Sequence, residues 1–150
     1  MHEMNENQTI TNDKVGGKVT VIVVCYNETP KKIRKTLLSI ISQDYRDLEM
    51  VVIDGKSGED TIKCLGEFRS KMTVFISESD KGIYDAMNKG IRNSTGEWLI
   101  FMNVGDSFYS EHTLSQLLDN QNKGFDILYG DVYREDKNKI TYPPKYINGF

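Results

Sequence analysis

The stretch Val19-Thr-Val-Ile-Val-Val-Cys25 decides the fold class, because it is almost wholly apolar and rich in β-branched residues. An unbroken run of this kind is typical of a strand that is covered on both faces, as in a parallel sheet. A short polar loop follows at Tyr26-Asn27-Glu28, and Thr29-Pro30 then predicts a helix start, with Thr as the N-cap and Pro in the first turn. The chain therefore opens with a strand, a loop and a helix.

The same alternation continues along the chain. Further strands are expected at residues 48–53, 72–76, 97–102 and 125–129. Apolar positions at helical spacing predict four helices. They lie around Ile33, Leu37, Leu38 and Ile41, around Ile62, Leu65 and Phe68, around Ile83, Met87 and Ile91, and from about 111 to 120. Ser57 and Asp60 resemble a capping box, and Gly90 is expected to weaken its helix. Strands that alternate with helices predict an α/β fold with a mainly parallel, doubly wound sheet. Residues 131–142 predict a short C-terminal β-hairpin.

Length and composition favour one soluble globular domain. The chain has 150 residues, which suits residues 1–17 as a flexible polar lead-in and 18–150 as a single domain. A net charge of −3 argues against nucleic-acid binding, which needs a basic face to neutralise phosphates. The N-terminus does not have the pattern of a signal peptide, and Cys25 and Cys64 both read as small buried hydrophobes, so a reducing compartment is expected.

Polar clusters stand at the ends of four predicted strands: Tyr26–Glu28, Asp54-Gly55, Asp80–Tyr84 and Asn103–Asp106. In an open α/β sheet, ligands bind outside the carboxyl ends of the strands. The four clusters are therefore expected to converge on one binding site.

The first two clusters suit a planar base. Tyr26 offers an aromatic face, although a loop tyrosine that closes the core is the alternative. Asp54 ends an apolar strand and could accept a hydrogen bond from a pyrimidine ring N–H, with an Asx-turn as the alternative.

The other two clusters suit anions and a cation. Asp80-Lys81-Gly82 precedes a helix, where backbone N–H groups and a lysine can meet phosphate, although a capped, solvated helix start is the alternative. Asp106 follows the fourth strand across a glycine, and its carboxylate suits Mg²⁺ or Mn²⁺ together with phosphate oxygens. The alternative for Asp106 is a turn residue.

These motifs together resemble the family 2 glycosyltransferases of bacterial polysaccharide and capsule synthesis. Val19–Glu28 (VTVIVVCYNE), Val51–Gly55 (VVIDG) and Ser79–Ile91 (SDKGIYDAMNKGI) carry the resemblance, which spans about residues 18 to 135. It implies a GT-A fold, inverting sugar transfer from a nucleotide-diphosphate donor, and Mn²⁺ or Mg²⁺. UDP is the favoured nucleotide, with GDP and dTDP as alternatives, and the implied acceptor is a saccharide or a lipid-linked molecule.

The resemblance also implies roles for individual residues and a location. Cys25, Tyr26, Asn27 and Asp54 would hold the nucleobase and ribose, Asp80, Lys81, Gly82 and Tyr84 would border the nucleotide and sugar, Asn103 would orient the donor sugar or a metal-bound water, and Asp106 would hold the metal. The implied location is the cytoplasm, with peripheral association at the inner face of the membrane left open.

Two departures from the family pattern stand out. Asn103 and Gly105 occupy positions where carboxylates often stand, so metal binding would rest mainly on Asp106. The catalytic base is expected beyond Phe150, because Asp131 is the one nearby candidate and a poor one. The chain would then be truncated before the acceptor-binding part and transfer little sugar by itself.

Two other functions were weighed. The first is a non-catalytic nucleotide-sugar-binding module. The second is a receiver-type signalling domain with Asp54 as phosphoacceptor, which the absence of an acidic pair after the first strand disfavours.

Overall fold

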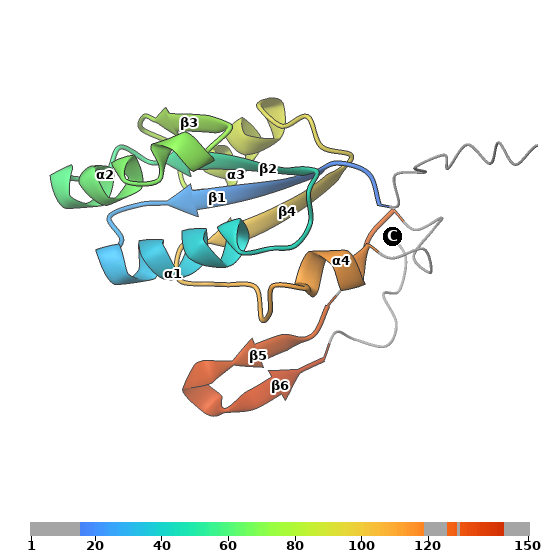
Figure 1. Cartoon of the computed structure of the whole chain (residues 1–150). Helices are drawn as coiled ribbons and strands as arrows, with labels where there is room; N and C mark the ends of the chain where they lie inside the picture. The colour runs from blue at the N-terminus through green and yellow to red at the C-terminus, as the bar shows by residue number, and fades with distance from the viewer. Residues whose placement is uncertain (1–15, 119–125, 129, 143–150) are drawn as a thin grey trace, which may run out of the picture.

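The computed structural model describes residues 16–118, 126–128 and 130–142. Strands and helices alternate through most of this part of the chain (Figure 1). The elements are β1 (Val19–Cys25), α1 (Pro30–Ile41), β2 (Leu48–Asp54), α2 (Glu59–Gly66), η1 (Arg69–Lys71), β3 (Val74–Ser77), α3 (Ile83–Arg92), β4 (Trp98–Asn103), α4 (Thr113–Leu117), β5 (Val132–Arg134), η3 (Glu135–Lys137) and β6 (Lys139–Thr141).

The main sheet has four parallel strands in the order β3-β2-β1-β4. Every residue of β1 is buried, as its unbroken apolar sequence predicts for an inner strand covered on both faces. Val19 of β1 lies level with Leu48 of β2 and with Trp98 of β4, so the three strands end near one another. The direction of strand succession reverses beside β1, and this switch point is where such sheets bind ligands.

Helices cover both faces of the sheet, so the predicted doubly wound architecture is confirmed. Figure 1 shows α1 and α2 on one face and α3 on the other. One apolar core joins alternate residues of β1 to Ile33 and Leu37 of α1 and to Leu65 of α2. A second core joins Ile22 and the other alternate residues to Ala86 of α3.

Gly90 has a packing role that could not be predicted from its low helix propensity. A Cβ added at Gly90 would lie 2.2 Å from Cγ2 of Ile22, so the missing side chain lets α3 approach β1 closely. The residue that was expected to weaken the helix is therefore a point of close contact between α3 and the sheet.

Some helix faces differ from the expected stripes. Leu38 is 53% exposed, whereas Thr36 and Ile40 are buried. In α3, Ile83 and Ile91 are both exposed, and the inward positions are Ala86 and Gly90. Apolar spacing was misleading here because small and polar residues fill the closest contacts.

Several predicted boundaries also shift. The N-cap of α2 is Gly58 rather than Ser57, because the Ser57 side chain bonds to Asp54 instead. Strand β3 begins and ends slightly later than expected, and α4 is shorter than the expected helix from 111 to 120, whose last two residues lie outside the described part. Residues 126–128 form no strand, while 125 and 129, the ends of the strand predicted there, lie outside the described residues, as does most of the predicted lead-in.

The predicted C-terminal hairpin is confirmed as the antiparallel pair β5–β6. Its turn is tied to α1 by an ion pair between Lys35 and Glu135, with Nζ and Oε1 2.9 Å apart. The rings of Tyr109 and Tyr133 make an edge-to-face contact with centroids 6.1 Å apart. The hairpin therefore lies beside the segment that follows β4.

A buried carboxylate closes the opposite end of the sheet from the strand-end loops. Glu49 is 2% exposed and accepts hydrogen bonds from the Thr20 hydroxyl and from the N–H of Thr95. Lys18 lies 3.7 Å from it. Burial acts to raise the pKa of Glu49, but these hydrogen bonds and the lysine outweigh it, so the pKa lies below its ordinary value.

Among the described residues, no helix has both the length and the apolar character that a membrane crossing requires.

Candidate functional site

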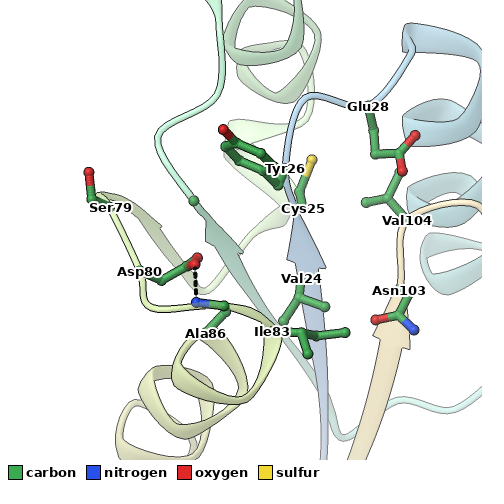
Figure 2. Close-up of a pocket in the computed structure, with 12 residues that line it drawn as sticks. Val24, Cys25, Tyr26, Glu28, Ser79, Asp80, Ile83, Ala86, Asn103 and Val104 are labelled. Carbon is green, nitrogen blue, oxygen red and sulfur yellow. Dashed lines mark hydrogen bonds between the residues drawn. The ribbon is translucent and has the colours of Figure 1, made fainter.

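A pocket of about 630 Å³ opens at the carboxyl ends of β1 and β4, beside the start of α3 (Figure 2). Residues from all four predicted clusters line it, so the expected convergence is observed. The lining residues are Val24, Cys25, Tyr26, Glu28, Gly55, Ser79, Asp80, Gly82, Ile83, Ala86, Asn103 and Val104. The pocket combines an apolar wall with a few carboxylate, hydroxyl and amide groups, which is the usual make-up of a small-molecule site.

The predicted site residues fall into two groups. Cys25, Tyr26, Asp80, Gly82 and Asn103 line the pocket, whereas Asn27, Asp54, Lys81, Tyr84 and Asp106 do not.

One side of the pocket is built around Gly55. A Cβ at Gly55 would lie 2.8 Å from Oδ2 of Asp80 and 3.1 Å from Cδ2 of Tyr26. The glycine thus lets both side chains lie against the end of β2. Tyr26 is 65% exposed, so its ring is available for stacking and does not close the core.

The side chain of Asp80 stabilises the turn that leads into α3. Its Oδ1 accepts a hydrogen bond from the N–H of Gly82, 2.9 Å away. The N–H of Lys81 donates to Oδ2 of Asp85 at 3.0 Å. Lys81 and Tyr84 are both exposed at this helix start and are not among the residues that line the pocket. Asp80 therefore orders the turn before α3 while it also lines the pocket, and the N-cap residue Gly82 has no side-chain cap.

Asp54 is wholly buried next to the pocket residue Gly55, and it anchors the neighbouring loops. Its Oδ2 accepts from the N–H of Ser57 at 2.9 Å and from the hydroxyl of Ser77 at 2.7 Å. Its Oδ1 accepts from the hydroxyl of Ser57. The bonds to Ser57 form the turn, expected from the sequence as an Asx-turn, that was the alternative to base recognition by Asp54. Direct contact between Asp54 and a base stays a prediction.

Asn27 extends this anchor to the loop after β1. Its backbone is left-handed, with φ of 49°, and its Oδ1 accepts from the N–H of Gly58 at 2.9 Å. Its own N–H donates to Oγ of Ser57 at 2.8 Å. Through Ser57 and Asp54, the loops after β1 and β2 and the end of β3 form one hydrogen-bonded unit.

Cys25 contributes shape to the pocket and no reactive thiolate. Burial, with a further contribution from the Asp54 carboxylate, raises the pKa of the Cys25 thiol to about 12. A protonated thiol is neither a nucleophile nor a metal ligand. Cys25 and Cys64 are both buried free cysteines, as expected from the sequence.

The loop after β4 presents Asp106. Asn103 and Val104 line the pocket, and Gly105 turns the chain with φ of 112°, a conformation that L side chains rarely adopt. Asp106 is exposed, and its carboxylate has no hydrogen bond or ion pair within the described part of the chain. It is therefore free to bind a ligand.

The donor set fits a hard divalent cation. No cluster of three acidic, histidine or cysteine ligands occurs among the residues that the structure describes. Mg²⁺ commonly uses one or two carboxylates and takes its other ligands from water and substrate phosphates. The Asp106 carboxylate and the nearby amide of Asn103 are oxygen donors of that kind.

Sequence reasoning gave no role to several pocket residues. Glu28 stands in the first cluster, but it was not assigned, and its carboxylate lies 2.8 Å from Nζ of Lys32 at the pocket edge. Ile83 and Ala86 form the apolar wall from the first turns of α3. The repeated strand-end position could have revealed Glu28, whereas the wall depends on how α3 packs.

Comparison with known protein families matches residues 20–149 to the family described as Glycosyl transferase family 2. The chain belongs to glycosyltransferase family 2. Its sheet, helices and hairpin form the GT-A fold, in agreement with the structural neighbours described next.

Curated members of the family resemble this chain in sequence. A PGL/p-HBAD biosynthesis glycosyltransferase of Mycobacterium bovis is 33% identical over 105 residues, which cover 67% of this chain and 41% of that protein. A GalNAc(5)-diNAcBac-PP-undecaprenol beta-1,3-glucosyltransferase of Campylobacter jejuni is 28% identical over 128 residues, covering 83% of this chain and 41% of that protein. The family 2 chain thus spans about two fifths of the length of these relatives.

Solved structures share the fold. A mannosyltransferase of Pyrobaculum calidifontis, in complex with GDP-Man and Mn²⁺, is 27% identical with a TM-score of 0.66, covering 74% of this chain and 34% of that chain. S. aureus TarS 1-349, in complex with UDP-GlcNAc, is 27% identical with a TM-score of 0.57, covering 66% of this chain and 29% of that chain. The chain therefore shares its family with these glycosyltransferases and its fold with the donor-bound structures.

Proposed function

We propose that this chain forms the donor-binding part of an inverting glycosyltransferase of bacterial surface polysaccharide synthesis. The donor is a nucleotide-diphosphate sugar, and the acceptor is a saccharide or lipid-linked molecule. The observation that carries the proposal is the pocket at the switch point of the sheet, where an exposed aromatic ring, the start of α3 and the first residues of the loop that leads to Asp106 lie around one opening. Family membership and the donor-bound neighbours support it.

The nucleobase would bind on the β1 side of the pocket. The ring of Tyr26 offers a stacking surface, and Gly55 leaves room beside it. Asp54 and Asn27 support this side from below by holding the loops together. We favour UDP from the family resemblance, with GDP and dTDP as alternatives. Of the two donor-bound neighbours, the mannosyltransferase contains GDP-Man and TarS 1-349 contains UDP-GlcNAc.

The diphosphate would lie between the start of α3 and the loop after β4. Backbone N–H groups at a helix N-terminus and the ammonium of Lys81 suit phosphate charge. Asp106 would hold Mn²⁺ or Mg²⁺, with Asn103 as a second oxygen donor toward the cation or the sugar. The cation would neutralise the charge that develops on the departing diphosphate.

Transfer itself requires an acceptor hydroxyl to attack the anomeric carbon in line with the leaving diphosphate. A base must remove the hydroxyl proton as the new glycosidic bond forms and the bond to the diphosphate breaks. We assign this base to none of the described residues. Donor binding is therefore the function that this chain is proposed to perform by itself, in the cytoplasm or at the inner face of the membrane.

A non-catalytic nucleotide-sugar-binding module is the second candidate. The replacement of frequent carboxylate positions by Asn103 and Gly105 favours it. Metal-dependent donor binding without hydrolysis or transfer, measured on the whole protein, would support this candidate over the enzyme.

The test is calorimetric titration of UDP, GDP and dTDP, each with and without Mn²⁺. Wild type is compared with Asp106→Ala and with Asp136→Ala, a control aspartate that is also exposed but lies in the turn of the hairpin. We expect one nucleotide to bind best, Mn²⁺ to strengthen its binding, and only Asp106→Ala to remove the strengthening. Absence of binding for all three nucleotides would contradict a donor site in this chain.

A further inference from the structure

The segment between β4 and α4 is irregular, yet it runs along α1 in a defined path. Only a few of its backbone groups bond to each other, for example the N–H of Asp106 to the carbonyl of Asn103 at 3.0 Å. Backbone groups near a protein interior need partners. For this segment, several partners are side chains of α1 and of the residues just after it.

Those side chains are Thr36, Ser39 and Gln43, which recur at the spacing of one helix face. Thr36 and Gln43 are buried, and the same face also carries the buried Leu37 and Ile40. Polar groups in such a place are costly unless they are hydrogen-bonded. Every one of the three bonds to the segment after β4.

Thr36 makes the contact nearest to the proposed metal ligand. Its Oγ1 accepts a hydrogen bond from the N–H of Gly105 at 2.8 Å and donates one to the carbonyl oxygen of Asp106 at 2.7 Å. The hydroxyl therefore bridges the N–H group at the start and the carbonyl group at the end of the two residues Gly105 and Asp106, where the chain turns with positive φ at Gly105.

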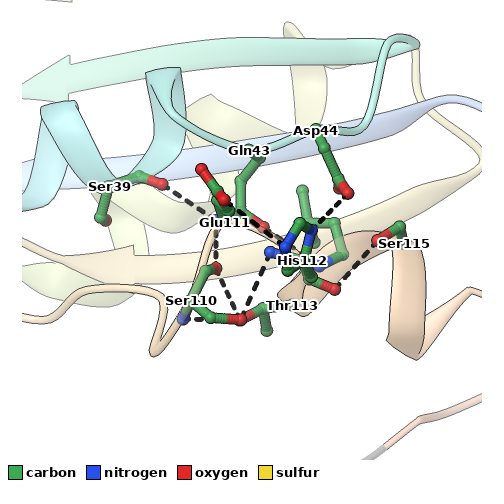
Figure 3. Close-up of polar contacts among 9 residues, drawn as sticks. Ser39, Gln43, Asp44, Ser110, Glu111, His112, Thr113 and Ser115 are labelled. Carbon is green, nitrogen blue, oxygen red and sulfur yellow. Dashed lines mark hydrogen bonds and ion pairs between the residues drawn. The ribbon is translucent and has the colours of Figure 1, made fainter.

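The side chains of Ser39 and Gln43 hydrogen-bond to the backbone farther along the same segment (Figure 3). Oγ of Ser39 accepts from the N–H of Phe108 at 3.2 Å. Nε2 of Gln43 donates to the carbonyl of Ser110 at 2.7 Å, and its Oε1 accepts from the N–H of Leu114 at 3.1 Å. These two contacts hold the path toward α4 rather than the turn at Asp106.

We propose that Thr36 is a positioning residue for Asp106, which fixes the direction of its carboxylate toward the donor cation through the Gly105 turn. This inference rests on the proposed function, because it takes Asp106 as the metal ligand. It assigns a functional reason to a buried hydroxyl on α1 that itself touches neither donor nor metal. Ser39 and Gln43, by contrast, stabilise the fold without controlling Asp106.

The test measures UDP affinity with and without Mn²⁺, and the ratio of the two dissociation constants is the readout. Thr36→Val keeps the side-chain shape and removes both hydrogen bonds. Loss of a group that orients a metal ligand typically lowers metal affinity by about 10-fold or more, so we expect the Mn²⁺ enhancement to fall about 10-fold. Metal-free UDP affinity should stay unchanged, and Thr36→Ser, which keeps the hydroxyl, should restore the enhancement.

Two further variants separate positioning from stability. Gln43→Met should lower the melting temperature while leaving the Mn²⁺ enhancement intact. Gly105→Ala perturbs the same turn from the loop side, through its positive φ, and should lower the enhancement as Thr36→Val does. It keeps the test decisive if Thr36→Val fails to fold.

The outcomes separate this inference from the proposed function. If Asp106→Ala abolishes the enhancement but Thr36→Val and Gly105→Ala retain it in full, Thr36 is not a positioning residue while the metal site stands. If wild type shows no Mn²⁺ enhancement, the metal role of Asp106 is wrong and the inference fails with it.

Discussion

Replacing Asp54 by asparagine tests whether the buried carboxylate anchors the loops or reads the base. The change conserves shape but removes the charge and one acceptor. In the structure, Oδ2 accepts from the N–H of Ser57 and the hydroxyl of Ser77, and Oδ1 accepts from the hydroxyl of Ser57. The amide oxygen of asparagine can take over the Oδ2 bonds, so the NH₂ group must face Oγ of Ser57.

The expected cost follows from these contacts. Oγ of Ser57 already accepts from the N–H of Asn27, so it would accept a second bond and its own hydrogen would lose its partner. Hydrogen bonds to a charged group contribute about 1.5–3 kcal/mol, against about 0.5–1.5 kcal/mol for neutral ones. We therefore expect Asp54→Asn to lower the free energy of unfolding by about 2 kcal/mol. For a chain of this size that corresponds to a fall in Tm of about 6 °C.

Thermal unfolding followed by circular dichroism measures the stability, and calorimetric titration of UDP at low temperature measures the binding. Ser77→Ala removes one of the bonds and should cost about half as much, near 1 kcal/mol. If Asp54 is an anchor, UDP affinity of the folded variant falls by less than 10-fold. An unchanged Tm combined with a larger loss of UDP affinity would refute the anchor and establish direct contact between Asp54 and the base.

Three further predictions concern stability and turnover. Gly90→Ala should lower the free energy of unfolding by about 1–2 kcal/mol in chemical denaturation, because overpacking against Ile22 outweighs the gain in helix propensity; a more stable variant would contradict the close contact. Glu49→Gln should be less stable at neutral pH and lose less stability on acidification. The folded-state pKa of Glu49 lies below its ordinary 4.5, so the stability that the carboxylate contributes is present above that pH and is lost as pH falls through the folded-state value. Parallel wild-type and variant curves of Tm against pH would exclude this contribution. Finally, because none of the described residues is assigned as the base, these 150 residues should release little UDP from UDP-sugars in a coupled assay with acceptor; robust transfer would show that the base lies among them.

The strand-and-helix order was predictable because it depends on local pattern. Val19–Cys25 is apolar at every position except Thr20, and such a run is stable only where both faces are covered. The polar clusters after the strands were predictable for a related reason, since parallel strands bring their carboxyl ends to one edge of the sheet. Pocket lining by Tyr26, Asp80 and Asn103 follows from that rule.

The local pattern could not predict which polar residues of the strand-end clusters are buried and structural and which are exposed. Asp54 and Asp106 look alike in sequence, each an aspartate close to a glycine after an apolar strand. The first is wholly buried and bonded to Ser57 and Ser77, while the second is exposed with its carboxylate unpaired in the described structure. That difference depends on which loops pack over each strand end, and those loops come from distant parts of the chain.

The sequence by itself therefore determined the α/β class, the alternation of elements and the edge of the sheet at which the candidate pocket opens, because these follow from residue periodicity and chain direction. Only the tertiary structure decided that Gly90 lets α3 contact Ile22, and that the hydroxyl of Thr36 hydrogen-bonds to the backbone of Gly105 and Asp106. Both are contacts between residues about 70 positions apart, as with the 70-residue separation of Thr36 and Asp106. Such contacts form only when the packed sheet and helices place the two segments together, and no local pattern in the chain encodes them.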